Sequence, residues 1–281
     1  MHGEDRVGAS EALTWNVVTV SYNSSRDLHE HWQGLVLPDG VRWTVVDNAS
    51  ADDSAEVARA LGAQVIVLPR NVGFGAANNI GASSVASENV LFVNPDIKID
   101  PVSLVVLEDV LQSDPSVVVA PQLINPDGTT QPSGRSFPTL PSKILNRLPK
   151  AAGRHYQITA ERGEQLYVSW AIGAALAMRS TTFAEIRWDE HFFVYYEDSD
   201  LGLRAWKGGH RVVLDGSVRW VHSWARDTTG FNARAWRLEL ASMAKFYFRY
   251  PHLLFPVSIA SWLHPERRWI GIPTSRSGRT A

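Results

Sequence analysis

Three carboxylic acids follow an aromatic run in the second half of the sequence. Residues 192–196 read Phe-Phe-Val-Tyr-Tyr and lead into Glu197, Asp198, Ser199 and Asp200. A carboxylate beside so much apolar bulk is costly to bury unless it is paired, holds a metal or takes part in chemistry. A helix that starts here would explain Ser199 or Asp200 as its N-cap. It accounts less well for the two acids before them, so a functional role is favoured for Glu197 and Asp198.

Polar residues also stand at the ends of predicted strands in the first half of the chain. They are Ser21 with Tyr22, Asp47, Arg70 and Asp96. Ligands of a parallel α/β sheet bind beyond the carboxyl ends of the strands, so the sequence predicts a binding site at this edge. Each residue alone has a simpler explanation, because Asp47 and Asp96 would also serve as turn formers or helix caps.

The alternation of strands and helices over the first 120 or so residues indicates a doubly wound, mostly parallel α/β sheet. Asp53, with Glu56 three residues later, predicts a capping box at the start of the second helix. A glycine-bearing loop at residues 70–79 runs into a further helix of small residues. Strands are predicted at 15–22, 41–46, 64–68, 90–93 and 117–120, and helices at 28–35, 54–61 and 103–111.

The second half of the chain has a weaker pattern. Residues 125–141 are predicted to form a long loop, and residues 150–165 a lid or insertion. The clearest amphipathic helix spans 232–248. Its apolar face is expected to hold Trp236, Leu240, Met243, Ala244 and Tyr247. Shorter predicted elements are an apolar segment at 168–178, a helix at 201–207 and two strands at 211–214 and 218–221.

Composition narrows the class of protein. The 281 residues are 44% hydrophobic and carry a net charge of −2, which suits a globular protein and gives no sign of a nucleic-acid partner. The absence of cysteine excludes disulfides, thiolate zinc sites and cysteine nucleophiles, and it is compatible with the cytoplasm. No window reaches the roughly 18 uninterrupted apolar residues of a spanning helix.

Familiar catalytic motifs are absent. The glycine loop follows the third strand rather than the first, and Asn78 replaces the third glycine of a dinucleotide fingerprint. There is no Walker motif, nucleophile elbow or HExxH, and His29 and His31 are two residues apart, which is wrong for one helical face. A nucleotidyltransferase stays open as an alternative, although residues 23–27 lack its usual glycine-rich basic loop.

Taken in order, the motifs resemble the family 2 inverting glycosyltransferases, and more narrowly their bacterial rhamnosyltransferase-like branch. The resemblance runs from about residue 15 to residue 250. It is carried by residues 19–23 (Thr-Val-Ser-Tyr-Asn), 47–50 (Asp-Asn-Ala-Ser), 71–75 (Asn-Val-Gly-Phe-Gly), 94–96 (Asn-Pro-Asp), Trp170 with Gly173, 197–201 (Glu-Asp-Ser-Asp-Leu) and His222. The resemblance implies a GT-A fold, a nucleoside-diphosphate sugar donor and a divalent cation, Mg²⁺ or Mn²⁺.

The resemblance also implies roles on the donor side. Asp96 would hold the cation against the diphosphate oxygens, with His222 completing the site as a neutral imidazole. Oxygen-rich coordination is what hard cations prefer. The first acid of the family's DxD element is Asn94 here, which predicts weaker metal affinity. The remaining nucleotide-sugar contacts would come from Val20, Tyr22, Asp47, Arg70, Asn71 and Gly73.

On the acceptor side, Asp198 would be the catalytic base and Glu197 its neighbour. Trp170 would present its ring to the acceptor sugar. Without the resemblance, Trp170 would be read as a core residue and His222 as a structural histidine. The implied activity is transfer of a sugar, L-rhamnose from a dTDP donor, to a glycan or lipid-linked acceptor in bacterial polysaccharide synthesis. A UDP-sugar donor, or a non-catalytic sugar-nucleotide-binding protein, is the alternative.

Four parts of the chain follow from these patterns. They are a mobile leader (1–13), a nucleotide-sugar-binding half (14–123), an acceptor-binding and catalytic half (124–250) and a C-terminal tail (251–281). Residues 253–263 are apolar and precede Arg267 and Arg268, so the tail either lies in the membrane interface or packs on the domain. We therefore expect a cytoplasmic protein, free or peripheral at the inner face of the membrane, with a homodimer left open.

Overall fold

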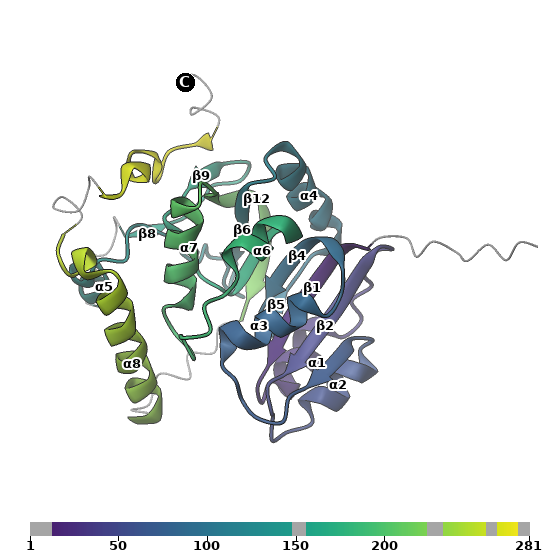
Figure 1. Cartoon of the computed structure of the whole chain (residues 1–281). Helices are drawn as coiled ribbons and strands as arrows, with labels where there is room; N and C mark the ends of the chain where they lie inside the picture. Colours follow the sequence, from purple (N-terminus) through teal and green to yellow (C-terminus); the bar gives the residue numbers. More distant parts are fainter. Residues whose placement is uncertain (1–12, 148–155, 224–232, 257–262, 275–281) are drawn as a thin grey trace, which may run out of the picture.

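A large mixed sheet forms the centre of the computed structural model, which describes residues 13–147, 156–223, 233–256 and 263–274 (Figure 1). The strands are ordered β3-β2-β1-β4-β11-β6-β12-β5, and β9 also pairs with β12. The predicted mostly parallel α/β sheet is confirmed for β3, β2, β1 and β4, which run parallel. The strand β11 interrupts this order because it is antiparallel to both β4 and β6.

The elements of the first half match the predicted alternation. Its strands are β1 (Leu13–Ser21), β2 (Val41–Asp47), β3 (Gln64–Val67), β4 (Ser87–Val93), β5 (Ile97–Lys98) and β6 (Val117–Ile124). Its helices are α1 (Ser25–Trp32), α2 (Ser54–Ala60), α3 (Phe74–Ser83), the 3₁₀ turn η1 (Pro101–Ser103) and α4 (Leu104–Ser113). The capping box predicted for α2 is wrong, because the N-cap Asp53 makes no side-chain cap hydrogen bond. Asp52 bonds the backbone N–H of Ser54 in its place.

The elements of the second half are shorter. The strands are β7 (Gly134–Arg135), β8 (Gln157–Ile158), β9 (Gln165–Tyr167), β10 (Trp170–Ala171), β11 (Ala175–Arg179) and β12 (Arg211–His222). The helices are α5 (Leu140–Arg147), α6 (Ser180–Ile186), α7 (Glu197–Lys207), α8 (Ala233–Arg249) and the 3₁₀ turns η3 (Pro251–Leu254) and η5 (Pro265–Trp269). The strands β10, β7 and β8 form a small second sheet in that order. The segment 125–141, predicted as a long loop, contains β7 and the start of α5.

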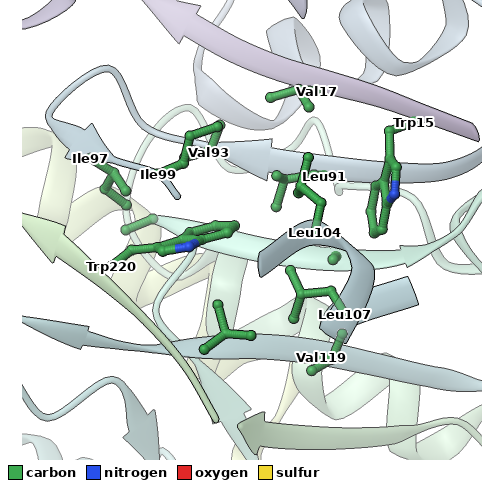
Figure 2. Packing of buried hydrophobic residues seen from close by; sticks show 14 of the residues in the cluster. Trp15, Val17, Leu91, Val93, Ile97, Ile99, Leu104, Leu107, Val119 and Trp220 are labelled. Atoms are coloured by element: carbon green, nitrogen blue, oxygen red, sulfur yellow. The ribbon is translucent and has the colours of Figure 1, made fainter. Parts of the chain in front are cut away.

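Alternating residues of the central strands fill two separate cores, one on each face of the sheet. Val17 and Leu91 point into a cluster closed by α4, where Leu104 and Leu107 lie (Figure 2). Their neighbours Val18 and Phe92 belong to the cluster on the opposite face. A strand with both faces buried has a nearly continuous apolar sequence. The sequence of β1 therefore predicts a strand in the centre of the sheet.

Two predicted elements differ from the structure. The two short strands predicted around residue 216 are one strand, β12, with an irregularity between Asp215 and Arg219. Gly216 and Ser217 resemble a turn, but Asp215 accepts a hydrogen bond from Ser217 N and the pairing with β6 resumes. The predicted face of α8 is also wrong in part, since Trp236, Leu240 and Ala244 are exposed.

The α8 helix packs through Tyr247, as predicted, and also through Ser242 and Phe246, which are buried. Figure 1 shows α8 on the far side of α7 from the large sheet. Within the described ranges, no helix is long and apolar enough to cross a membrane. Residues 1–12 of the predicted leader, 148–155 of the predicted lid, Asn232, and 257–262 and 275–281 of the predicted tail lie outside the described residues.

Candidate active site

The carboxyl ends of β1, β2 and β4 open into a cavity of about 500 Å³. Six of the nine residues predicted for the donor side and its metal line this cavity: Val20, Tyr22, Asn71, Gly73, Asn94 and Asp96. Ser24, Asp27, Asn48, Phe74, Pro95, Phe193, Val194, Tyr195 and Leu238 complete the lining. We call this cavity the sheet-edge pocket. It therefore combines strand ends with residues from the aromatic run and from α8.

An asparagine that sequence reasoning did not single out holds the glycine loop in place. Asn48 Oδ1 accepts from Val72 N at 2.8 Å, and Asn48 Nδ2 donates to Asn71 Oδ1 at 3.0 Å. Gly73 has a φ of +93°, and a Cβ there would lie 2.6 Å from Phe193 O. Only glycine fits this backbone conformation and this close approach. The loop is thereby fixed against the aromatic run that precedes the acids.

Asp47 and Arg70 do not line the sheet-edge pocket. Asp47 is buried at the end of β2, where Oδ2 accepts a hydrogen bond from Ser50 N. Its Oδ1 is buried and has no hydrogen-bond partner among the described residues. Arg70 lies beside an adjoining depression lined by Asn71, Glu190 and other residues. Asp47 thus adjoins the pocket through its strand end, and Arg70 adjoins it through Asn71.

The two predicted metal ligands face each other across the end of the sheet. His222 Nε2 lies 3.3 Å from Asp96 Oδ2, and Asp96 Oδ1 is buried without a partner in the described structure. Gln131 Oε1 accepts from His222 Nδ1 at 2.7 Å, so the proton of a neutral ring sits on Nδ1. The other ring nitrogen, Nε2, faces a carboxylate oxygen.

An imidazole nitrogen and a carboxylate oxygen at this spacing can share a proton or hold a cation together. Gln131 in turn bonds Asn125 through its amide nitrogen, which fixes the orientation that holds the imidazole. Within the described ranges no cluster of three or more His, Cys, Asp or Glu residues suits a metal. One carboxylate and one imidazole still fit a cation whose other ligands are water and diphosphate oxygens.

The two predicted acids line a second, smaller cavity of about 250 Å³ together with Trp170. The other lining residues are Arg135, Lys143, Asn146, Tyr156, Tyr195, Tyr196 and Glu239. We call this cavity the α7 pocket. Except for Tyr195 and Tyr196, these residues were missed from the sequence, because they come from β7, α5, α8 and the residue just before β8 and carry no local motif. Tyr195 lines both pockets.

The acids enter the α7 pocket through an unusual start to α7. Tyr195 and Tyr196 have φ values of +68° and +72°, a left-handed conformation that is costly for bulky residues. The N-cap of α7 is Tyr196, so Ser199 and Asp200 are not caps as predicted. Glu197 and Asp198 stand in the first helical turn, where the helix dipole favours negative charge.

Glu197 and Asp198 divide one charge between them. Burial and the neighbouring Asp198 raise the pKa of Glu197 from 4.5 to about 8, and Glu197 Oε2 has no partner among the described residues. Burial also raises the pKa of Asp198, opposed by Lys143 and by the N–H groups of Ser199 and Gly173. Glu197 therefore holds its proton near neutral pH, whereas the two N–H groups favour the ionised form of Asp198.

Asp200 has a different environment two residues further on. It is fully buried, and its oxygens accept from Arg204 Nε at 2.6 Å, Arg249 at 2.9 Å and the Tyr250 hydroxyl at 2.9 Å. These contacts hold α7 to the end of α8. Asp200 is therefore a structural acid, whereas Asp198 is partly buried and lines a cavity.

Gly173 lies where the two pockets meet. A Cβ at this position would lie 3.5 Å from Asp198 Cβ and 3.6 Å from Phe74 Cε1. Phe74 lines the sheet-edge pocket and Asp198 lines the α7 pocket. A substrate in the first pocket can therefore approach the carboxylate of the second across Gly173 and Tyr195.

Comparison with solved structures places this fold among the GT-A glycosyltransferases. GalNAc-T7 superposes with a TM-score of 0.58 at 17% identity, over 79% of this chain and 45% of that one. TarS of S. aureus superposes with a TM-score of 0.51 at 18% identity, over 75% of this chain and 60% of that one. At these identities the likeness shows the fold.

Sequence comparison gives the family. Residues 16–171 match glycosyl transferase family 2, and the chain belongs to this family. The N-acetylglucosaminyl-diphospho-decaprenol L-rhamnosyltransferase of Mycobacterium tuberculosis is 29% identical over 75% of this chain and 76% of its own length. The rhamnosyltransferase WbbL of Escherichia coli K12 is 26% identical over 63% of this chain and 70% of its own. The protein is therefore a glycosyltransferase, as the resemblance predicted.

Proposed function

We propose that this glycosyltransferase transfers L-rhamnose from dTDP-rhamnose, with inversion, to a hydroxyl of a lipid-linked or glycan acceptor in cell-surface polysaccharide synthesis. The donor sugar rests on the names of the mycobacterial and Escherichia coli relatives. The observation that carries the reaction type is the position of Asp198, a partly buried, ionised acid where the two pockets meet.

The sheet-edge pocket suits the donor. Tyr22 and Val20 would border the base, Asn71 and the backbone around Gly73 would face the diphosphate, and Arg70 would add positive charge at the rim. Asp47 would bond the base through its buried, unpartnered Oδ1 after a small shift of the loop. A divalent cation held by Asp96 and His222 would neutralise charge on the departing diphosphate.

The α7 pocket suits the acceptor. Its hydroxyl would lie against Asp198, which takes the proton while the hydroxyl oxygen bonds to the anomeric carbon. The bond from that carbon to the diphosphate oxygen breaks on the opposite face, and the electron pair leaves with the diphosphate. Trp170 would border the acceptor sugar, because aromatic faces suit the apolar faces of sugar rings.

The two halves of the domain would divide this work, with residues 14–123 for the donor and 124–250 for the acceptor. The division is not strict, since Phe193, Tyr195 and Leu238 of the second half line the sheet-edge pocket. Closing the donor site would therefore depend on the same aromatic run that positions the acids.

A thermal-shift panel tests the donor. A ligand that binds only the native state raises Tm, so dTDP-rhamnose with Mn²⁺ should raise it more than UDP-glucose, UDP-GlcNAc or GDP-mannose. Transfer from dTDP-rhamnose to an N-acetylglucosaminyl-diphospho-lipid is then measured directly. Binding without transfer to any acceptor would favour a non-catalytic sugar-nucleotide-binding protein.

A UDP-sugar donor is the second candidate. It is favoured by the solved neighbours, since GalNAc-T7 was determined with UDP and Mn²⁺, and TarS with UDP-GlcNAc. A larger shift with a UDP-sugar than with dTDP-rhamnose in the same panel would select this candidate.

A further inference from the structure

The outward face of α8 is apolar where solvent would be expected to select polar residues. Phe248 is 90% exposed and Leu240 is 50% exposed, and Ala241 and Ala244 are exposed between them. At 3.6 residues per turn these four residues fall within an arc of about 100°. The opposite arc holds Ser242 and Phe246, which are buried. The outward face of α8 thus has a second apolar stripe that the fold does not bury.

The exposed apolar surface continues past the end of α8. Leu254 and Phe255 are 41% and 54% exposed. The preceding residue, Leu253, is buried in the same cluster as Phe246. The η3 turn contacts both α8 and α5, and α5 exposes Ile144 and Leu145. We call this region the α8 surface, and it consists of Ile144, Leu145, Leu240, Ala241, Ala244, Phe248, Leu254 and Phe255.

The charge of the chain is strongly divided at α8. Residues 233–281 hold eight basic and two acidic residues, a net charge of +6, whereas the preceding 232 residues hold 19 basic and 27 acidic residues, a net charge of −8. Arg237 lies on the exposed arc of α8, and Arg267 and Arg268 of η5 are also exposed. Basic residues around exposed apolar side chains complement an anionic lipid surface.

The inward side of the same elements borders both pockets. Leu238 of α8 lines the sheet-edge pocket, and Glu239 lines the α7 pocket. Lys143 and Asn146 of α5 line the α7 pocket as well. A surface that contacts lipid here would bring the membrane next to the cavity assigned to the acceptor.

We propose that the α8 surface docks the protein on an anionic lipid bilayer, so that a lipid-linked acceptor enters the α7 pocket from the membrane. The orientation of the acceptor rests on the proposed function, but the docking itself does not. The predicted membrane contact of the tail is thereby extended to α8 and α5.

Vesicle flotation of the full-length protein tests the proposal. Vesicles of phosphatidylcholine with phosphatidylglycerol should carry the protein, with binding that weakens as salt rises. Phosphatidylcholine alone should carry at least tenfold less. The double variant Phe248→Ser and Phe255→Ser, and separately Arg267→Glu with Arg268→Glu, should each lose at least tenfold in binding. Val36→Ser and Val102→Ser, which change exposed apolar residues outside the α8 surface, should bind like the parent chain.

Equal binding by the parent chain and both double variants would overturn the proposal, as would no binding to anionic vesicles. A dimer in light scattering that the Phe248 and Phe255 changes dissociate would assign the surface to a second copy and also overturn it. Transfer to a water-soluble acceptor analogue reports separately on the proposed function. Loss of vesicle binding with that transfer intact separates the two proposals.

A second, independent observation concerns Lys143. Its Nζ lies 3.6 Å from the centroid of the Tyr196 ring and 5.0 Å from that of Trp170, and it donates to Ser199 Oγ at 3.1 Å. Ser199 Oγ lies 3.3 Å from Asp198 Oδ1. Because an ammonium only donates, the hydroxyl proton of Ser199 is left for the carboxylate. Lys143, Ser199 and Asp198 thus form a directed chain of donors.

We infer that Lys143 is a positioning residue, which acts through Ser199 to orient Asp198 and keep it ionised. The charged and titratable groups around Asp198 are Glu197 on the same helix, Arg135 of β7, Tyr156, and Glu239 of α8. The Arg135 Nη1 donates to the carbonyls of Pro132 and Gly134, so among the described residues Arg135 acts on Asp198 through its charge and not through a hydrogen bond. Lys143 is therefore the cation whose hydrogen bonds lead to the base.

The pH profile of kcat/KM tests this role. Lys143→Met should move the acidic limb to higher pH and lower the rate at pH 6 by at least tenfold, and Lys143→Arg should restore much of the profile. Ser199→Ala keeps the charge but breaks the chain, so its limb should move by less in the same direction. Lys207→Met, at the exposed end of α7, should leave the profile unchanged. An acidic limb that stays in place in both Lys143→Met and Ser199→Ala would overturn the inference.

Discussion

The two pockets are built in different ways, although they share Tyr195 and meet at Gly173. The sheet-edge pocket takes its polar atoms from the ends of neighbouring strands and from the loop that Asn48 ties down. The α7 pocket takes its charged groups from a helix turn, two other helices and a two-residue strand. The first is positioned by backbone pairing and the second by side-chain packing.

This difference determines what each pocket tolerates. Strand ends are fixed by ladders of hydrogen bonds, so a side-chain change in the sheet-edge pocket should alter ligand contacts without moving the frame. The α7 pocket depends on contacts between aromatic rings and on the buried acids Glu197 and Asp198. A change there should therefore also alter the stability of the protein and the pKa of these acids. The following predictions test this contrast, from the largest expected effect to the smallest.

The largest effect is expected at Asp198. Asp198→Asn would remove the proposed base for the acceptor's proton, so turnover should fall at least about 100-fold. Nucleotide-sugar affinity, measured by calorimetry, should stay within about twofold because the donor lies in the other pocket. Asp109→Asn on the exposed side of α4 is the matched control. A variant with near-parental turnover would remove Asp198 from the mechanism.

Asp200→Asn should give the opposite outcome. It leaves Arg204 and Arg249 without their buried partner, and breaking such a pair costs about 3–5 kcal/mol in free energy of unfolding. Denaturant unfolding should therefore show a large loss of stability. If Asp198→Asn destabilised the protein as much as Asp200→Asn, the distinction between a catalytic and a structural acid on this helix would fail.

The next prediction concerns the metal site. Asp96→Asn should raise the Mn²⁺ concentration for half-maximal activity by at least about tenfold, and Gln131→Leu should raise it by less, because Gln131 only orients His222. Removal of metal with EDTA should abolish transfer by the parent chain reversibly. Donor transfer at unchanged rate in EDTA would show that Asp96 and His222 serve another purpose.

Glu197 provides a test through stability rather than activity. In the unfolded chain its carboxyl ionises near 4.5, but in the fold it keeps its proton to about pH 8. The folded state therefore loses stability as pH rises from about 4.5 to 8 and stays at that lower level above 8. Glu197→Gln removes this loss, and each pKa unit is worth about 1.4 kcal/mol.

The Glu197→Gln variant should thus be more stable than the parent by several kcal/mol at pH 9 and nearly equal to it at pH 4. Denaturant unfolding at both pH values, without donor or metal, measures the difference. A difference that stays constant across pH would mean that Glu197 does not hold a shifted proton. It would also undo the assignment of the charge to Asp198.

The two pockets also differ in how well they can be predicted from the sequence. The runs at 15–22, 41–46 and 90–93 are apolar and β-branched, so they predicted the sheet. Of the polar residues at their ends, Tyr22 and Asn94 line the pocket as predicted, whereas Asp47 only adjoins it. Arg135, Lys143 and Tyr156 carry no such signal, because contacts between segments far apart in the chain bring them to α7. Bulky residues normally adopt φ < 0, so the sequence also did not predict the left-handed conformation of Tyr195 and Tyr196 before α7.

The smallest effect is expected at Trp170, which either packs in the core or contacts the acceptor sugar. Trp170 is buried, yet its Nε1 has no partner among the described residues, and its ring lines the α7 pocket. Trp170→Phe would remove a hydrogen bond that Nε1 can donate to the acceptor. Because such a bond is worth about 0.5–1.5 kcal/mol, the KM for the acceptor should rise by about three- to tenfold. The affinity for the donor should not change.

Trp206→Phe is the matched control for this prediction. Its Nε1 donates to Val168 O at 2.9 Å, so its loss should lower Tm and leave the acceptor KM in place. If the two variants lower Tm alike and neither alters the acceptor KM, Trp170 belongs to the core. The aromatic side of the α7 pocket would then hold α7 in place and not the sugar.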